Sequence, residues 1–244
     1  MMFQVKACGM THKGKIRDKN EDALLMNNTI LQEELMASPI CFEIQDSYLI
    51  FAVADGLGGH ACGEVASLMV LKTLMEEKPK DAESLNHTLH KARDRLETFA
   101  QENPHAYGLG SAIAGLVMSQ KGVFVFNVGD CRVYGIKEQK VKRLTSDHTE
   151  VERLLKLGYI TEQEAKHHPY RHMLTSALVG NASFREFEVF IKKVNGSGSF
   201  VICSDGLWEL VEDEELIYPP KELMLLALSR GGKDNISFIK LEVL

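Results

Sequence analysis

Long apolar runs are missing from this 244-residue sequence. None reaches the roughly 18–20 residues that a bilayer-spanning helix requires, and the N-terminal stretch MMFQVKACGMTHKGK lacks the apolar core of a signal peptide. Positive charge is also in deficit, because 28 Lys and Arg stand against 34 Asp and Glu for a formal net charge of −6. This balance disfavours a nucleic acid or an anionic membrane as a partner. We therefore expect a cytoplasmic protein that binds neither.

Cysteine pairs at metal-binding spacing are missing as well. The five cysteines are scattered, odd in number and contain no C-x-x-C pair, which predicts neither a disulfide framework nor a zinc site. Cys131 and Cys203 lie in or beside apolar strand-like runs, so we interpret them as small buried residues. The other three are Cys8, Cys41 and Cys62.

Internal repeats and low-complexity tracts are absent too, and a content of 45% apolar and 25% charged residues is typical of a soluble globular protein. A chain of this length can bury about 70–75% of its unfolded surface in one core. We expect a single domain over residues 1–244, and a monomer.

Both helices and strands are indicated by the hydrophobic pattern. Helical periodicity predicts helices at Gly63–Glu77, Leu85–Gln101 and Pro220–Leu228. The pair Gly129-Asp130 and the tetrapeptide KEQK are predicted turns of an antiparallel hairpin or meander, whereas Asn27–Asp46 is compatible with a hairpin or a long loop. Strands are predicted for the apolar runs Tyr48–Ala54, Val123–Val128, Val133–Ile136, Phe200–Cys203 and Ile236–Val243.

The stretch 147–180 differs from the rest because it has little strand character. Thr149 with Glu152, and Thr161 with Glu164, have the spacing of capping boxes, which predicts two short helices. We interpret this stretch as a flap appended to the domain.

Acidic residues occur where the predicted strands stop. Asp55, Asp130 and Asp205 each end an apolar run, Asp234 precedes the last one, and Glu21-Asp22 lies near a fifth strand. Asp beside Gly is common turn chemistry, which explains any one of these positions. Turn chemistry is a poor account of all of them together, and the acids converge if the strands are neighbours.

Converging carboxylates repel one another and persist only where cations neutralise them. Oxygen ligands without His or Cys at ligand spacing favour Mg²⁺ or Mn²⁺ over zinc or copper, and no EF-hand loop is present for Ca²⁺. Two hard cations roughly 3.5–4 Å apart can activate a water and clamp a phosphoryl group for in-line displacement. Asp55, at the mouth of the turn DGLGG, would then bridge the cations.

A dinucleotide site is the alternative for the same turn, because Gly56, Gly58 and Ala61 match the pattern G-x-G-x-x-G/A. The carboxylate of Asp55 would lie against the pyrophosphate, however, and no acid about 20 residues further on offers a contact to the ribose from a second strand. We therefore disfavour a dinucleotide.

Eight motifs follow one another through nearly the whole chain. They are GKIRDKNEDA (14–23), VADGLGGHACGEVAS (53–67), GLGSAIAGL (108–116), FNVGDCRVY (126–134), LTSDHT (144–149), LTSALVG (174–180), VICSDGLWELV (201–211) and GGKDNIS (231–237). With this set the chain resembles the metal-dependent serine/threonine protein phosphatases of type 2C, in their short bacterial form. The resemblance implies an α+β fold, a four-layer α-β-β-α sandwich of two antiparallel sheets flanked by antiparallel helices.

The resemblance also implies a role for each acid. Asp55 would bridge two Mn²⁺ or Mg²⁺ ions. Glu21 and the carbonyl of Gly56 would bind one of them, and Asp205 and Asp234 would bind the other.

Further roles are implied around this pair of ions. Asp22 would orient the metal-bridging water that attacks phosphorus, and Arg17 would hold the substrate phosphate with its bidentate fork. A third, looser metal would be held by Asp130, Asp205 and Glu209.

Two positions depart from the family pattern. Glu209 stands where some relatives have Asp, which affects the third metal. Leu57 replaces the histidine of animal members and cannot protonate a leaving alkoxide. We interpret His60, which starts the following helix, as a structural residue, and we expect metal-bound water to donate the proton.

The implied activity is hydrolysis of phosphoserine and phosphothreonine in proteins without a phosphoenzyme, opposing a bacterial Ser/Thr kinase. The alternatives are a catalytically silent module of the same fold that binds phosphoproteins, and a Mg²⁺-dependent hydrolase of small phosphorylated metabolites. A silent module is disfavoured because every expected acid is present. The basic cluster of the flap would contact the phosphoprotein or present a solvated face, and it comprises Lys166, His167, His168, Arg171 and His172.

Overall fold

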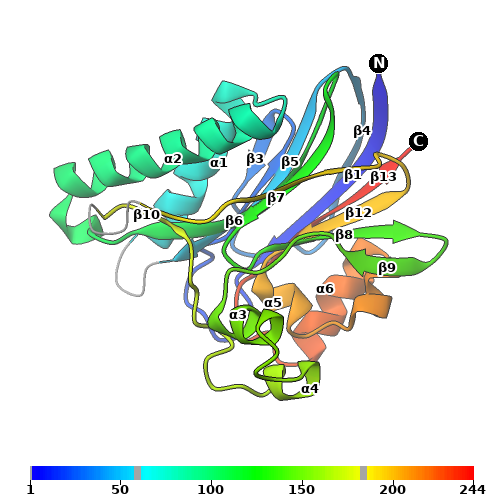
Figure 1. Ribbon diagram of the computed structural model, residues 1–244. Helices are drawn as coiled ribbons and strands as arrows, with labels where there is room; N and C mark the ends of the chain where they lie inside the picture. The colour runs from blue at the N-terminus through cyan, green and yellow to red at the C-terminus, as the bar shows by residue number, and fades with distance from the viewer. Residues whose placement is uncertain (1, 58–61, 182–185) are drawn as a thin grey trace.

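Two antiparallel β-sheets stack face to face, and helices cover the outer face of each sheet (Figure 1). The structure is a computed structural model, and it describes residues 2–57, 62–181 and 186–244. Sheet A has the strand order β4-β1-β13-β12-β8-β9. Sheet B has the order β11-β7-β6-β5-β2-β3, with β10 paired to β6. This arrangement confirms the predicted α+β sandwich.

The elements have the following bounds. Sheet A contains β1 (Phe3–His12), β4 (Ile40–Asp46), β8 (Arg132–Lys137), β9 (Lys140–Arg143), β12 (Ser199–Cys203) and β13 (Ile236–Val243). Sheet B contains β2 (Ala23–Met26), β3 (Thr29–Leu31), β5 (Leu49–Leu57), β6 (Gly110–Ser119), β7 (Gly122–Val128), β10 (Leu178–Val179) and β11 (Phe190–Val194). The helices are α1 (Gly63–Glu77), α2 (Ala82–Glu102), α3 (Glu150–Lys156), α4 (Glu162–Ala165), α5 (Asp205–Trp208) and α6 (Pro220–Ser229), with 3₁₀ turns at Pro104–Ala106 and Asp213–Ile217.

Strand β6 shows why the layers form. All of its residues are buried, because Ile113 on one face packs in the cluster that contains Leu71 of α1, while Leu116 on the other face packs in the cluster that contains Ile202 of sheet A. A strand covered on both faces has a continuous apolar run instead of an alternating one. On the far side of sheet A, Leu223 of α6 belongs to a third apolar cluster with Phe238 of β13.

The three helices predicted from periodicity are present, and each predicted range falls within the observed one. The KEQK turn is also confirmed, since Glu138 and Gln139 join β8 to β9 with φ values of 51° and 61°. The hairpin predicted at Gly129-Asp130 is wrong. Strand β7 belongs to sheet B and β8 to sheet A, so this pair carries the chain from one sheet to the other.

One cysteine prediction is wrong. Cys8 and Cys41 occupy directly opposed positions of β1 and β4, and they form a disulfide. The sequence does not reveal this pair because β4 lies in Asn27–Asp46, the stretch whose pattern defines no element. Cys131 and Cys203 are free and buried, as predicted.

The 147–180 segment carries the two predicted short helices, α3 and α4. Thr149 Oγ1 accepts a hydrogen bond from Glu152 N at 3.2 Å, and Thr161 with Glu164 forms a complete capping box. The carboxylate of Glu152 binds Arg143 of β9. Figure 1 shows the segment at the lower edge of the molecule, beside α5.

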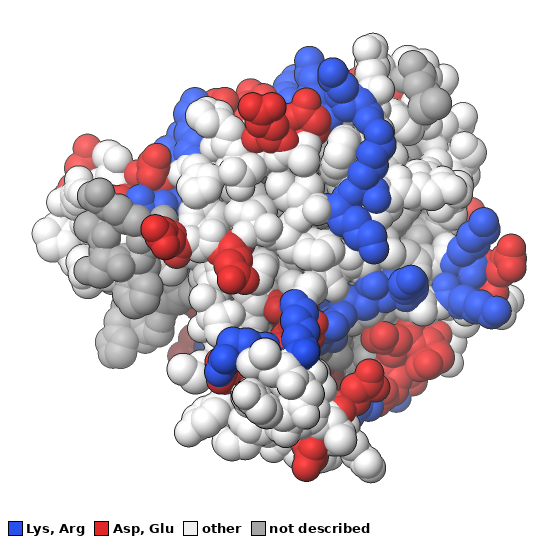
Figure 2. Space-filling view, in the orientation of Figure 1, with Lys and Arg blue, Asp and Glu red and all other residues white. Residues whose placement is uncertain are grey.

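Positive charge is unevenly distributed over the surface. Figure 2 shows a band of lysine and arginine side chains on the face that carries β11 and the hairpin of β8 and β9. The exposed lysines of these strands and their turn are Lys137, Lys140, Lys142, Lys192 and Lys193. No helix in the described part of the chain combines the length and the apolar character needed to cross a bilayer.

Candidate metal centre

The strand ends that carry the acids meet at one end of the sandwich. In sheet B, Asp22 directly precedes β2 and Asp55 lies near the end of β5, which is the neighbour of β2. In sheet A, Asp205 follows β12 and Asp234 precedes β13, and these two strands are also neighbours. The sandwich therefore brings acids from both sheets together.

We call Asp22, Asp55, Asp130, Asp205 and Asp234 the carboxylate cluster. Asp55 interacts electrostatically with each of the other four. Burial raises the pKa of Asp55 well above its usual range, and the charges of Asp22, Asp205, Asp130 and Asp234 raise it further. Burial is also the first cause that raises the pKa of Asp22 and of Asp130, each to about 7, and it raises the pKa of Asp205. Such groups remain ionised together only beside a compensating positive charge.

Two fully buried oxygens of the carboxylate cluster have no hydrogen-bond partner. Asp22 Oδ2 accepts a hydrogen bond from Ser204 Oγ at 2.8 Å, but Asp22 Oδ1 and Asp205 Oδ1 are buried and unpartnered. A buried polar atom left unsatisfied costs about 1–3 kcal/mol, so native proteins contain few of them. Unsatisfied carboxylate oxygens among several acids fit hard divalent cations.

Glu21 and the carbonyl of Gly56 face a common space beside Gly63, the first residue of α1. A Cβ atom at Gly63 would lie 2.7 Å from Glu21 Oε1 and 3.1 Å from Gly56 O. Only glycine leaves this space open. Burial and then the charge of Glu64 raise the pKa of Glu21. Both oxygens therefore lie close to the start of α1.

Asn235 fixes the position of Glu21, a role that the sequence analysis does not identify. Its Oδ1 accepts a hydrogen bond from Glu21 N at 2.9 Å, and its Nδ2 donates to the carbonyls of Lys13 and Lys19 at 3.0 and 2.9 Å. The only sequence signal is its place directly after Asp234, where asparagine also suits a turn.

Arg17 lies at the rim of the carboxylate cluster. Its Nη2 is 2.7 Å from Asp234 Oδ2, and its side chain is 52% exposed. The hydrogen bond to Asp234 is the largest of the effects that raise the pKa of Arg17, and the charges of Asp55 and Glu21 add to it. The guanidinium is therefore next to the acids and accessible to an anion from solvent.

Trp208 contacts Asp130 and Arg132 stacks on Trp208, and the sequence alone indicates neither role. Trp208, the single tryptophan of the chain, donates from Nε1 to the carbonyl of Asp130 at 2.9 Å. The guanidinium of Arg132 lies 3.4 Å from the centroid of the Trp208 ring, and it binds both carboxylate oxygens of Asp147. Asp130 is thereby linked to the start of the 147–180 segment.

His172, a residue of the predicted basic cluster of the flap, lies next to Glu209 and Asp205. Its Nδ1 lies 3.1 Å from Glu209 Oε1. Among residues 2–57, 62–181 and 186–244, one set of three potential metal ligands has all its ligand atoms within 4.8 Å of one another, and it consists of His172, Asp205 and Glu209.

Several predicted features lie at or beyond the end of β5. Leu57 ends the strand and offers no proton donor. Gly58, His60 and Ala61 lie outside the described residues.

The carboxylates gathered at one end of the sandwich are the kind of oxygen ligand that hard divalent cations prefer. A family model described as protein phosphatase 2C matches residues 36–235, and the chain belongs to this family. The resemblance seen in the eight motifs is thereby confirmed.

Individual relatives cover almost the whole chain. The serine/threonine phosphatase stp of Listeria monocytogenes is 31% identical over an aligned length of 251 residues. The alignment covers 95% of this chain and 93% of that protein. The crystal structure of serine/threonine phosphatase Stp1 from Staphylococcus aureus is 30% identical, with a TM-score of 0.80 and coverage of 98% and 94%. That of the Mycobacterium tuberculosis phosphatase PstP/Ppp is 25% identical, with a TM-score of 0.79 and coverage of 98% of each chain.

Proposed function

We propose that this protein is a divalent-cation-dependent phosphatase that hydrolyses phosphoserine and phosphothreonine in proteins. The observation that carries the proposal is the cluster of buried acids with unsatisfied oxygens, in a chain of the protein phosphatase 2C family. The name of the Listeria relative, a serine/threonine phosphatase, supports the substrate class.

Two Mn²⁺ or Mg²⁺ ions would be held by Glu21, Asp55, the carbonyl of Gly56, Asp205 and Asp234. Asp55 would be shared, since it interacts with acids of both sheets. When bound, such cations supply Lewis acidity, which lowers the pKa of water and neutralises charge on a phosphoryl group. Ligands that are all oxygens suit these ions.

Arg17 binds the substrate phosphate. Its planar fork offers two parallel N–H groups, which match two phosphate oxygens. The guanidinium is half exposed at the rim, so a phosphorylated side chain reaches it without rearrangement of the core. Asp234 would help to hold a cation, and Arg17, which contacts Asp234 here, would then be free to bind phosphate.

Asp22 orients the water that attacks phosphorus. Ser204 fixes one oxygen of its carboxylate, and the other oxygen remains available to accept a proton or hydrogen bond from water. The side chain of Leu57 cannot donate a proton to the leaving alkoxide, so the proton comes from water.

The 147–180 segment serves as the flap that contacts the protein substrate, within a single domain. It lies beside α5, because Lys166 Nζ is 3.7 Å from Glu212 Oε2 and His172 contacts Glu209. Substrates of a bacterial Ser/Thr kinase, or the kinase itself, would be dephosphorylated.

Phosphate release from a phosphothreonine peptide tests this function, with p-nitrophenyl phosphate and a small sugar phosphate as comparison substrates. We expect Mn²⁺-dependent release from the peptide, and a preference for the peptide that is lost when residues 150–173 are replaced by a short linker. Peptide binding without release would support the silent module instead. Equal release from the sugar phosphate, with no effect of the replacement, would support a metabolite hydrolase.

A further inference from the structure

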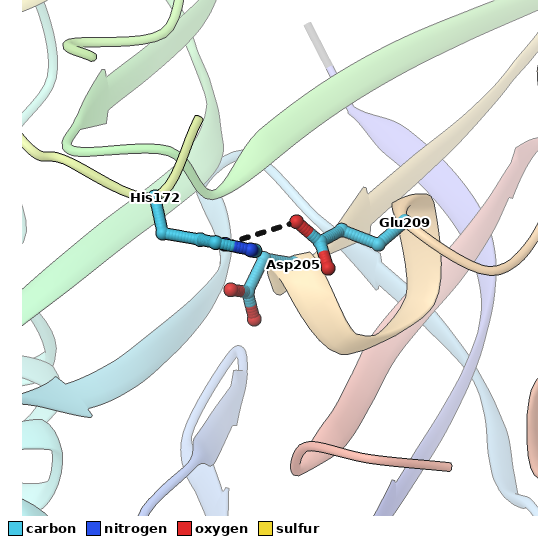
Figure 3. Close-up of side chains that lie close together, drawn as sticks. All are labelled: His172, Asp205 and Glu209. Atoms are coloured by element: carbon cyan, nitrogen blue, oxygen red, sulfur yellow. Dashed lines mark ion pairs between the residues drawn. The ribbon is translucent and has the colours of Figure 1, made fainter. Parts of the chain in front are cut away.

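His172, Asp205 and Glu209 bring two kinds of ligand atom to one place. Figure 3 shows the imidazole of His172 reaching from the 147–180 segment toward carboxylates that belong to α5 and its C-terminal end. The imidazole Nδ1 is 3.1 Å from Glu209 Oε1, and the ligand atoms of all three residues lie within 4.8 Å of one another. Asp205 and Glu209 are four residues apart, which places them on one side of a helical turn.

The backbone around His172 is held by hydrogen bonds, so its approach to Glu209 does not depend on a loose loop. Met173, the next residue, donates to Tyr170 O at 3.0 Å and accepts from Glu150 N at 2.9 Å. One residue further on, Leu174 forms an antiparallel bridge with Thr149. The histidine is thereby tied to the base of the 147–180 segment.

A simple ion pair between His172 and Glu209 does not account for Asp205. Asp205 Oδ1 is buried without a hydrogen-bond partner, and nothing in a His–Glu pair satisfies it. A divalent cation shared by the three side chains would take a carboxylate oxygen of Asp205 as a ligand and would also neutralise the carboxylates. The arrangement is one nitrogen with two carboxylates, which differs from the oxygen-only set of the two-cation centre.

We propose that His172 is a metal ligand, and that it completes with Asp205 and Glu209 a mixed nitrogen and oxygen site that prefers transition-metal ions such as Mn²⁺ to Mg²⁺. This inference rests on the proposed function, because Asp205 belongs to the same carboxylate cluster. It differs from the sequence-based third site, which contains oxygen ligands only.

Two consequences follow from a nitrogen ligand on this segment. Imidazole binds first-row transition-metal ions more tightly than it binds Mg²⁺, with Mn²⁺ the weakest binder of that series, so the identity of the bound metal depends on this site. The cation also joins the 147–180 segment to α5, so its binding restrains the segment over the carboxylate cluster. Metal availability would therefore control how protein substrates reach the site.

Pulsed electron paramagnetic resonance of the Mn²⁺-loaded full chain tests the nitrogen ligand directly. We expect ¹⁴N modulation from a coordinated imidazole in the wild type, and its loss in His172→Ala. The matched control is His167→Ala, which removes an exposed imidazole of the same segment and should retain the modulation. An identical ¹⁴N signal in the wild type and His172→Ala, or no ¹⁴N signal in the wild type at saturating Mn²⁺, would overturn the proposal.

Equilibrium dialysis of the same proteins measures the selectivity. His172→Ala should weaken the weakest Mn²⁺ site about tenfold or more, with much less effect on Mg²⁺. Equal weakening for both ions would show a merely structural role and would reject the ligand. Phosphopeptide turnover by the wild type, measured in parallel, separates this inference from the proposed function. If the wild type turns over the peptide but His172→Ala leaves the affinity of the weakest Mn²⁺ site unchanged, only this inference fails. If the wild type does not bind Mn²⁺, both proposals fail.

Discussion

Arg17 and Asp234 form an exposed ion pair at the rim of the carboxylate cluster. Exposed pairs contribute roughly 0–1 kcal/mol to stability, so this contact does little to hold the fold together. Its effect is on position, because it keeps a guanidinium beside the acids with more than half of the side chain accessible to solvent.

Removing this guanidinium should affect substrate binding more than it affects folding. We expect Arg17→Ala to raise KM for a phosphothreonine peptide about tenfold to a hundredfold, the value of one or two charge-assisted hydrogen bonds, with a smaller change in kcat. Steady-state kinetics with Mn²⁺ measures this. Lys15→Ala, an exposed cation two residues away, is the control. An unchanged KM in Arg17→Ala would remove it from the phosphate site.

Residues that end a strand can be found from sequence, whereas residues that act by long-range contact cannot. Asp55 and Asp205 stand out because each interrupts an apolar run beside glycine. Asn235 looks like a turn residue until the fold brings Glu21 to it across 214 positions of the chain. His172 looks like surface charge until the 147–180 segment lies against α5.

At the scale of elements, the pairing of β1 with β4 has a covalent consequence. The Cys8–Cys41 disulfide closes a loop of 33 residues between these strands of sheet A. Cysteine spacing alone does not indicate this bond. Phe42 and Ile44 alternate with Glu43 and Gln45 in β4, which is a strand pattern, but the sequence does not show that β4 pairs with β1. Gly129-Asp130 does not reveal the change of sheet, because the same dipeptide suits a hairpin and a crossing between sheets.

Two measurements test this disulfide: the free energy of unfolding and the number of reactive thiols. For a loop of this length, chain entropy predicts that Cys41→Ser lowers the free energy of unfolding of the oxidised protein by up to about 3–4 kcal/mol. Urea unfolding with and without reductant measures the loss, and the reduced wild type should match the variant. The unfolded, oxidised wild type should contain three reactive thiols; five would contradict the pairing.

At the scale of the whole molecule, the site exists because two sheets bring their acids to one end of the sandwich. The pKa of Asp22 and that of Asp130 are raised by burial from 3.8 to about 7. A carboxyl with a higher pKa when folded binds its proton more tightly in the folded state, so the protonated form stabilises the fold. That stability is present below about pH 4 and is lost as pH rises through about 7.

The metal-free protein should therefore become less stable as pH rises. In excess EDTA we expect the thermal unfolding midpoint to fall between pH 5 and pH 8, and added Mn²⁺ to restore it at pH 8 because bound cations stabilise the folded state. Asp22→Asn should show a smaller fall, since it has one titrating group fewer. Differential scanning calorimetry at matched ionic strength measures all three, and a midpoint independent of pH in EDTA would refute the account of the carboxylate cluster.

The most direct test of the account is the rate of phosphate release from a phosphothreonine peptide, measured for the wild type and Asp205→Asn with Mn²⁺ and with excess EDTA. Asn keeps the shape of the side chain and removes the charge that holds the cation. We expect Mn²⁺-dependent release by the wild type, none in EDTA, and release at least about a hundredfold slower in Asp205→Asn. Release that persists in EDTA, or that survives the substitution, would contradict it.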